Sequence, residues 1–131
     1  MKLLLDTHIW LWSRLEPARL SRRVAKELQA AGNELWLSPI SIWETVIHCE
    51  KGRLSLDGGA AAWILKAMRE VPMTEAPLTA EVALAAASVD LQHRDAADRF
   101  LIAAARVFGL TLVTADRRLL KTRQAPVLPN R

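Results

Sequence analysis

The 131-residue chain is 51% hydrophobic and 24% charged, a composition typical of a globular domain with its own core. No apolar run approaches the roughly 20 residues of a transmembrane helix, and the first one is shorter than a signal-peptide core. The single Cys49 excludes an internal disulfide and, by itself, a zinc site. We therefore expect one cytoplasmic domain spanning residues 1–131.

The chain is basic, with 18 lysine and arginine residues against 14 acidic ones and a formal net charge of +4. This balance favours an anionic partner such as nucleic acid or an acidic protein, although many basic proteins bind neither. Aromatic residues make up only 5% of the chain and tyrosine is absent. The composition therefore does not indicate an aromatic stacking platform for single-stranded bases.

Short apolar segments that predict strands alternate with longer segments that have helical spacing. The predicted strands are MKLLLDT (1–7, ending on Asp6), 34–37, 71–77, 110–114 and 126–128. The predicted helices are 8–14, 22–31, 39–51, 60–70, 80–88 and 96–108. This alternation predicts an α/β fold, a central, mainly parallel β-sheet flanked by helices in an α/β/α sandwich.

Polar residues mark the predicted helix starts, and spacing predicts the helix faces. The expected N-caps are Ser21, Ser38, Thr79 and Asp95. Helical spacing places Trp43, Met68 and Leu84 among the inward-facing side chains of their helices.

Four acidic residues occupy positions that suggest chemistry. Asp6 and Asp116 follow predicted strands, and Asp98 lies in the first turn of a helix on its inner face. Each of these three has a simple structural explanation, as a cap or as a partner of the helix dipole. Glu44 has none, because it falls mid-helix on an apolar stripe, where a carboxylate is costly unless it is paired.

Together the four acids can converge over one edge of the sheet, where ligands bind in open parallel sheets. Packed carboxylates repel one another, so the cluster needs raised pKa values or a cation. Oxygen ligands suit Mg²⁺ or Mn²⁺. Without these four, 18 basic residues outnumber 10 acids, and an acidic metal site in a basic body suits a phosphodiester.

Four segments in this order carry a family resemblance: LLLDTHIWLW, SPISIWE, HRDAADRFLIAAA and GLTLVTADRRL. The chain resembles the PIN-domain ribonucleases, in particular VapC-type toxins of type II toxin–antitoxin pairs. The resemblance covers nearly the full length. It implies a PIN domain that hydrolyses RNA phosphodiester bonds as a Mg²⁺- or Mn²⁺-dependent endoribonuclease. It also implies a homodimer and a VapB-like antitoxin that blocks the site.

The resemblance assigns metal-binding and catalytic roles to Asp6, Glu44, Asp98 and Asp116. It gives Thr7 and Thr114 supporting hydrogen bonds. Many relatives have Asp-Pro where this chain has Asp95-Ala96, and the missing proline should loosen only the helix entry. We expect Asp95 to be a cap first and an outer support of the site second.

Other residues near these motifs have two interpretations each. Arg94 and Arg99 either clamp the RNA backbone or are solvated at the helix end. His93 either moves a proton or lies on the surface. Trp10 and Trp12 either line a groove for the antitoxin or pack in the core.

Three rival functions remain open from sequence. A receiver-like Mg²⁺-binding signalling module needs paired acids after its first strand, but Thr7-His8 follows Asp6. A phosphatase with an aspartyl nucleophile needs an acid where His8 stands. A non-catalytic RNA-binding protein is the third, because carboxylates alone do not establish turnover.

Overall fold

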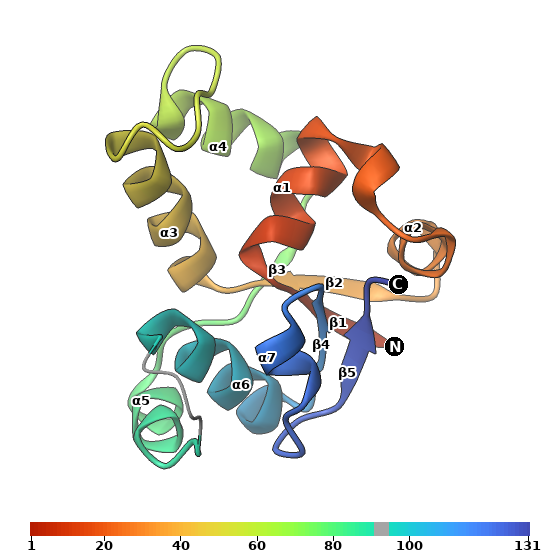
Figure 1. Ribbon diagram of the computed structural model, residues 1–131, viewed down its shortest axis with the longest axis vertical. Coiled ribbons are helices and arrows are strands. Elements are labelled where there is room, and N and C mark those ends of the chain that lie inside the picture. The colour runs from red at the N-terminus through yellow and green to blue at the C-terminus, as the bar shows by residue number, and fades with distance from the viewer. Residues whose placement is uncertain (91–94) are drawn as a thin grey trace.

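The computed structural model describes residues 1–90 and 95–131, which form a five-stranded sheet with helices on both faces (Figure 1). The strands are β1 (Lys2–Leu5), β2 (Glu34–Leu37), β3 (Thr74–Glu75), β4 (Thr111–Thr114) and β5 (Val127–Pro129). Their order is β3-β2-β1-β4-β5, and every neighbouring pair is parallel. The predicted α/β architecture with a parallel sheet is thus confirmed.

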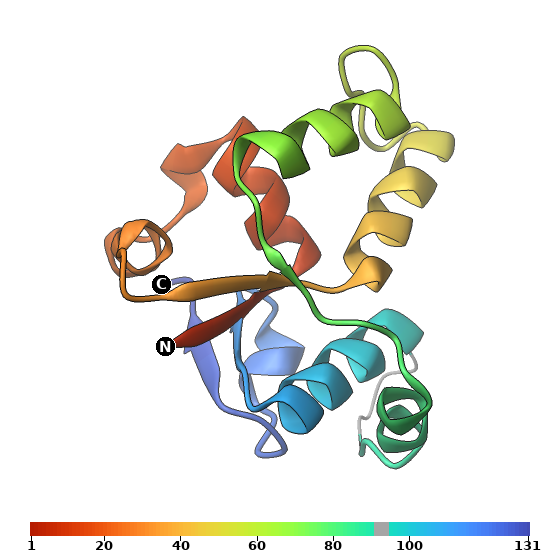
Figure 2. The same cartoon turned by 180° about the vertical axis from the view of Figure 1, so that it is seen from behind.

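The helices divide between the two faces of the sheet. They are α1 (Thr7–Leu15), the 3₁₀ turn η1 (Pro17–Arg19), α2 (Arg22–Gln29), α3 (Pro39–Glu50), α4 (Ala60–Glu70), α5 (Ala80–Ala87), α6 (Ala96–Phe108) and α7 (Arg117–Leu120). Figures 1 and 2 show α1, α3 and α4 on one side of the sheet and α5, α6 and α7 on the other. In the described ranges, 1–90 and 95–131, no helix has the length and apolarity needed to cross a membrane.

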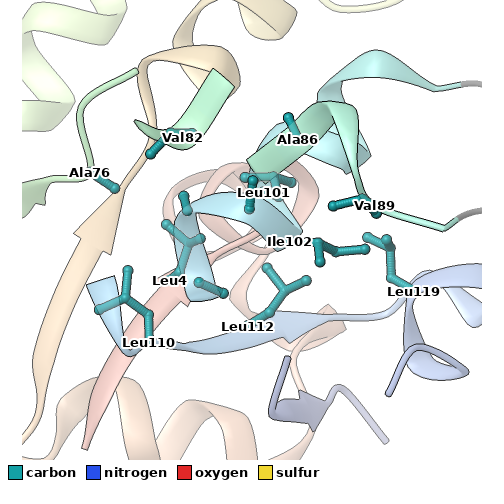
Figure 3. Packing of buried hydrophobic residues seen from close by; sticks show 13 residues of the cluster. Leu4, Ala76, Val82, Ala86, Val89, Leu101, Ile102, Leu110, Leu112 and Leu119 are labelled. Atoms are coloured by element: carbon teal, nitrogen blue, oxygen red, sulfur yellow. The ribbon is translucent and has the colours of Figure 1, made fainter. Parts of the chain in front are cut away.

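Successive side chains of β1 point to opposite faces of the sheet, and each face has its own hydrophobic core. Leu3 and Leu5 point into one cluster with Trp10 and Ile64, while Leu4 points into the other with Leu101. Successive strand residues face opposite sides, so a strand covered by helices on both faces has to be apolar at every position. Figure 3 shows the second cluster, in which α5 and α6 pack against β1 and β4.

The predicted N-caps are confirmed at α2, α3, α5 and α6. In each, the cap side chain accepts a hydrogen bond from a backbone N–H two or three residues further on. At the other end of α6, Gly109 adopts a left-handed φ of 67°, which glycine reaches without steric cost. These local signals fix where the helices that carry Glu44 and Asp98 begin.

Three predicted inward side chains are exposed instead. The exposed fraction is 57% for Trp43, 39% for Met68 and 76% for Leu84, so those predictions were wrong. Helix α5 is short and apolar apart from Glu81, so spacing among its apolar residues cannot identify the face that packs. Tertiary contact selects Val82 and Ala86, which are buried against α6.

The third strand and the end of α2 differ from their predicted bounds. The third strand is confined to Thr74–Glu75, since the prolines of 71–77 have no N–H for a sheet ladder. Helix α2 ends at Gln29 rather than at residue 31. Neither difference alters the edge of the sheet where Asp6 and Asp116 lie.

Candidate metal-binding site at the carboxyl edge of the sheet

The carboxyl ends of the parallel strands bring the predicted acids to one edge of the sheet. Strands β1 and β4 are neighbours, with Leu5 paired to Val113. The backbone N–H of Asp6 donates to the carbonyl of Val113 at 3.0 Å, so Asp6 lies beside the end of β4. Four acids border this edge and are called the acidic cluster below: Asp6, Glu44, Asp98 and Asp116.

Asp6 is buried and held by two hydrogen bonds. Its Oδ1 accepts from the backbone N–H of Thr7 at 2.7 Å, and its Oδ2 accepts from Thr114 Oγ1 at 2.6 Å. Burial raises the pKa of Asp6, and the hydrogen bond from Thr114 acts in the opposite direction. The carboxyl group is therefore fixed in orientation but costly to ionise without a cation.

Glu44 lies on α3 and is hydrogen-bonded to Thr7. Thr7 Oγ1 lies 2.6 Å from Glu44 Oε1 and 2.9 Å from Ser41 Oγ. Burial raises the pKa of Glu44 to about 7, and repulsion from Asp6, Asp95 and Asp98 adds to this shift. Glu44 is therefore paired by the Thr7 hydroxyl, and Ser41 on the same helix is fully buried.

Asp98 and Asp116 share a cation from the chain itself. Asp98 is buried in the first turn of α6, as predicted. Arg118 Nη2 lies 3.0 Å from Asp116 Oδ2 and 4.0 Å from Asp98 Oδ2. Arg118 was not among the residues predicted from the sequence. Its position two residues after Asp116 is the signal that could have identified it.

The residues around the start of α6 have separate environments. Asp95 caps the helix by accepting from the backbone N–H of Ala97 at 3.0 Å. Arg99 Nη1 donates to the carbonyl of Val89 at 2.7 Å, which ties it to the segment after α5. His93 and Arg94 lie outside the described residues. Trp10 is 1% exposed and packs edge-on against Trp63, so it belongs to the core.

The acidic cluster suits a hard divalent cation by its chemistry but is not closed around one. In the part of the chain that the structure describes, no three Asp, Glu, His or Cys side chains are close enough to enclose a metal ion. Arg118 already provides one positive charge to Asp98 and Asp116. An all-oxygen donor set whose carboxylates repel one another, with a guanidinium as stand-in cation, fits Mg²⁺ or Mn²⁺.

Comparison with known proteins supplies the family. Residues 3–124 match the sequence model of the PIN domain. Over 119 residues the chain is 34% identical to Ribonuclease VapC22 of Mycobacterium tuberculosis, an alignment covering 88% of each chain. The fold is similar to that in the crystal structure of VapBC2 from Rickettsia felis bound to a promoter DNA fragment, with a TM-score of 0.73 and 16% identity over 98% of both chains. It is also similar to DNA-bound VapBC from Salmonella typhimurium, with a TM-score of 0.68 and 17% identity over 98% of both chains. The resemblance carried by the four sequence segments is confirmed, and the chain belongs to the PIN-domain family.

Proposed function

We propose that this protein is a metal-dependent endoribonuclease that hydrolyses RNA phosphodiester bonds as the toxin of a VapBC-type toxin–antitoxin pair. The observation that carries the proposal is the acidic cluster, which gathers carboxylates from four separate elements at one edge of the sheet. Thirty-four per cent identity to a protein named Ribonuclease VapC22 supports the reaction class.

The acidic cluster is proposed to hold Mg²⁺ or Mn²⁺. When bound, the metal would activate a water molecule and stabilise negative charge on the scissile phosphate and the leaving oxygen. Thr7 and Thr114 orient the carboxyl groups of Glu44 and Asp6 through hydrogen bonds of 2.6 Å each. Outer hydrogen bonds of this kind fix the ligand oxygens before the metal arrives and thereby raise metal affinity.

Burial and mutual repulsion make the acidic cluster favourable for a cation. The pKa of Glu44 is raised to about 7, so its ionised form is costly near neutral pH, and a bound divalent ion would lower that cost. Crowding negative charges together without a metal destabilises the folded state. This cost is the physical reason to assign the acidic cluster to metal binding rather than to stability.

The partners follow from the same family. Crystal structures with this fold contain VapBC complexes from Rickettsia felis and Salmonella typhimurium, which supports a VapB-like antitoxin. We also propose a homodimer, as the family resemblance implies, and the exposed large apolar side chains of Trp43 and Leu65 are candidates for its interface. The protein would act in the cytoplasm, where its RNA substrate is.

The direct test is cleavage of RNA by the purified chain with Mg²⁺, with Mn²⁺ and with EDTA. Asp98→Asn keeps the size of the side chain and removes its charge, so we expect at least about a hundredfold loss of cleavage. The exposed Asp57→Asn is the matched control and should cleave like the wild type. Cleavage that persists in EDTA and in Asp98→Asn would sink the proposed mechanism.

A further inference from the structure

Arg118 lies on the solvent side of two members of the acidic cluster. Its side chain is 57% exposed, whereas the side chains of Asp116 and Asp98 are 27% and 9% exposed. Its Nε lies 3.3 Å from Asp116 Oδ1, and its Nη2 lies 3.0 Å from Asp116 Oδ2 and 4.0 Å from Asp98 Oδ2. A substrate that approaches these carboxylates from solvent therefore meets the guanidinium.

The backbone of α7 is anchored, while the Arg118 side chain extends toward solvent. Leu119, the next residue, is fully buried in the hydrophobic cluster that also contains Ile102 of α6 (Figure 3). The backbone N–H of Arg118 donates to Asp116 Oδ1 at 2.9 Å. The main chain of Arg118 is thus held at the edge of the site, and its long side chain can reach more than one partner from there.

The contact between Arg118 and the two carboxylates is easily exchanged for another. Water screens an ion pair whose cation is more than half exposed, and holding a long side chain in one position costs entropy. Such pairs therefore add little to stability. Arginine also stays protonated in proteins, so its positive charge persists when its partner changes.

A phosphate group is the natural second partner for this side chain. The planar guanidinium matches the oxygens of a phosphate as well as those of a carboxylate, and both contacts can be bidentate. Arg118 would lose much of its attraction to Asp116 and Asp98 once a divalent ion neutralises them. A phosphodiester that enters the site then offers the nearest new negative charge.

We propose that Arg118 changes partners during the reaction cycle, from Asp116 and Asp98 in the metal-free protein to a non-bridging oxygen of the scissile phosphate in the loaded one. This inference rests on the proposed ribonuclease function and adds a phosphate-binding residue to the acidic cluster. In the first state Arg118 reduces repulsion between the carboxylates. In the second it stabilises the negative charge that develops on the phosphate.

A purely charge-compensating role for Arg118 makes the opposite prediction. If the guanidinium only offsets the carboxylates, its removal weakens RNA binding most when no metal is present, because the bare acids then repel the phosphates. Partner exchange predicts the larger effect with metal bound, since the guanidinium contacts the RNA only in that state. The sign of this difference distinguishes the two roles.

RNA binding with and without Ca²⁺ measures that difference. The probe is a fluorescein-labelled, mixed-sequence RNA of about 12 nucleotides, titrated with the full chain in EDTA or in Ca²⁺, which takes oxygen ligands as Mg²⁺ does but in a looser geometry. Gel electrophoresis checks that the RNA is intact after each titration. Arg118→Gln removes the charge, Arg118→Lys keeps it without the planar fork, and the exposed Arg117→Gln is the matched control.

We expect Arg118→Gln to weaken RNA binding by about fivefold or more in Ca²⁺ and by no more than about twofold in EDTA. Arg118→Lys should recover part of the loss in Ca²⁺, because it keeps the charge but not the bidentate contact. Arg117→Gln should stay within about twofold of wild type in both conditions. Thermal unfolding of each variant shows that the exposed substitutions leave the fold intact.

The outcomes separate this inference from the proposed function. An effect of Arg118→Gln that is equal in both conditions, larger in EDTA, or shared by Arg117→Gln would overturn partner exchange, and cleavage by wild type with Mg²⁺ would leave the ribonuclease standing. An Arg118 effect confined to Ca²⁺, in a protein that cleaves RNA with no metal, would support partner exchange in RNA binding and contradict the enzyme.

Discussion

The hydroxyl of Thr114 donates a buried hydrogen bond of 2.6 Å to Asp6 Oδ2, although the two residues are 108 positions apart in the chain. This bond joins the ends of neighbouring strands β1 and β4 at the edge where the acidic cluster lies. It fixes one oxygen of a carboxyl group that burial otherwise makes costly to ionise.

Thr114→Val tests that support, because valine keeps the shape of the side chain and removes the donor. We expect metal affinity and RNA cleavage to fall by about 10- to 100-fold, the usual cost of losing such an outer hydrogen bond. Thermal unfolding measured at increasing metal concentrations gives the metal affinity. Thr111→Val, at the other end of β4, is the control. Equal loss in both variants would show a general defect of the strand.

Glu44→Gln tests the electrostatic cost of the acidic cluster through stability. The pKa of Glu44 is raised from 4.5 to about 7, so its stabilising contribution is complete below pH 4.5 and lost as pH rises through 7. Glutamine stays neutral and still accepts from Thr7. In EDTA at pH 8 the variant should therefore be more stable than wild type by about 1–2 kcal/mol, allowing for partial exposure of the side chain.

Urea unfolding at pH 5 and pH 8 measures this difference, which should close at the lower pH. Glu50→Gln, at the exposed end of the same helix, should show no such pH-dependent gain. A Glu44→Gln protein that is less stable than wild type at pH 8 would refute the electrostatic explanation. Mg²⁺ should stabilise wild type more than Glu44→Gln.

Arg118→Gln tests whether the guanidinium occupies the place of a cation. Arg118 lies 3.0 Å from Asp116 and 4.0 Å from Asp98, so a metal ion has to displace it or share these carboxylates with it. Removing it should tighten Mn²⁺ binding by about two- to fivefold, the modest effect expected of an exposed ion pair. Calorimetric titration measures this, with the exposed Arg117→Gln as control. Weaker Mn²⁺ binding in Arg118→Gln alone would instead make the guanidinium a support of the site.

A pair of truncations in α5 tests the corrected packing of that helix. Val82 is fully buried and Leu84 is 76% exposed. Val82→Ala should lower the free energy of unfolding by about 2 kcal/mol, whereas Leu84→Ala should change it by less than about 0.5 kcal/mol. Chemical denaturation of dilute protein measures both. A larger cost for Leu84→Ala that grows with protein concentration would place this side chain in a dimer interface.

Local signals in the sequence were sufficient to locate most elements. Ser38 with Pro39 marks the start of α3, and Asp95 with Gly109 brackets α6, because caps and turn glycines satisfy backbone groups within a few residues. The faces of α3 and α5 were harder. Trp43 and Leu84 have helical spacing from other apolar residues, but only the neighbouring layers determine which side is covered.

Glu44 was selected correctly from the sequence, although its surroundings were described incompletely. Its position suggested a carboxylate among apolar side chains. The structure instead gives it a hydrogen bond of 2.6 Å from the Thr7 hydroxyl, which also lies 2.9 Å from Ser41 Oγ. The family resemblance already made Thr7 a hydrogen-bonding support, but only the fold shows that it donates to Glu44, 37 residues away.

By itself, the sequence determined the alternation of strands and helices, the parallel sheet and the family, because periodicity, caps and ordered motifs are local properties of the chain. Only the tertiary structure decided that Thr114 donates to Oδ2 of Asp6 in particular, and that Arg118 bridges Asp98 and Asp116. Those contacts arise when neighbouring strands bring their carboxyl ends together and helices turn one face toward another, relationships in space that sequence spacing does not encode.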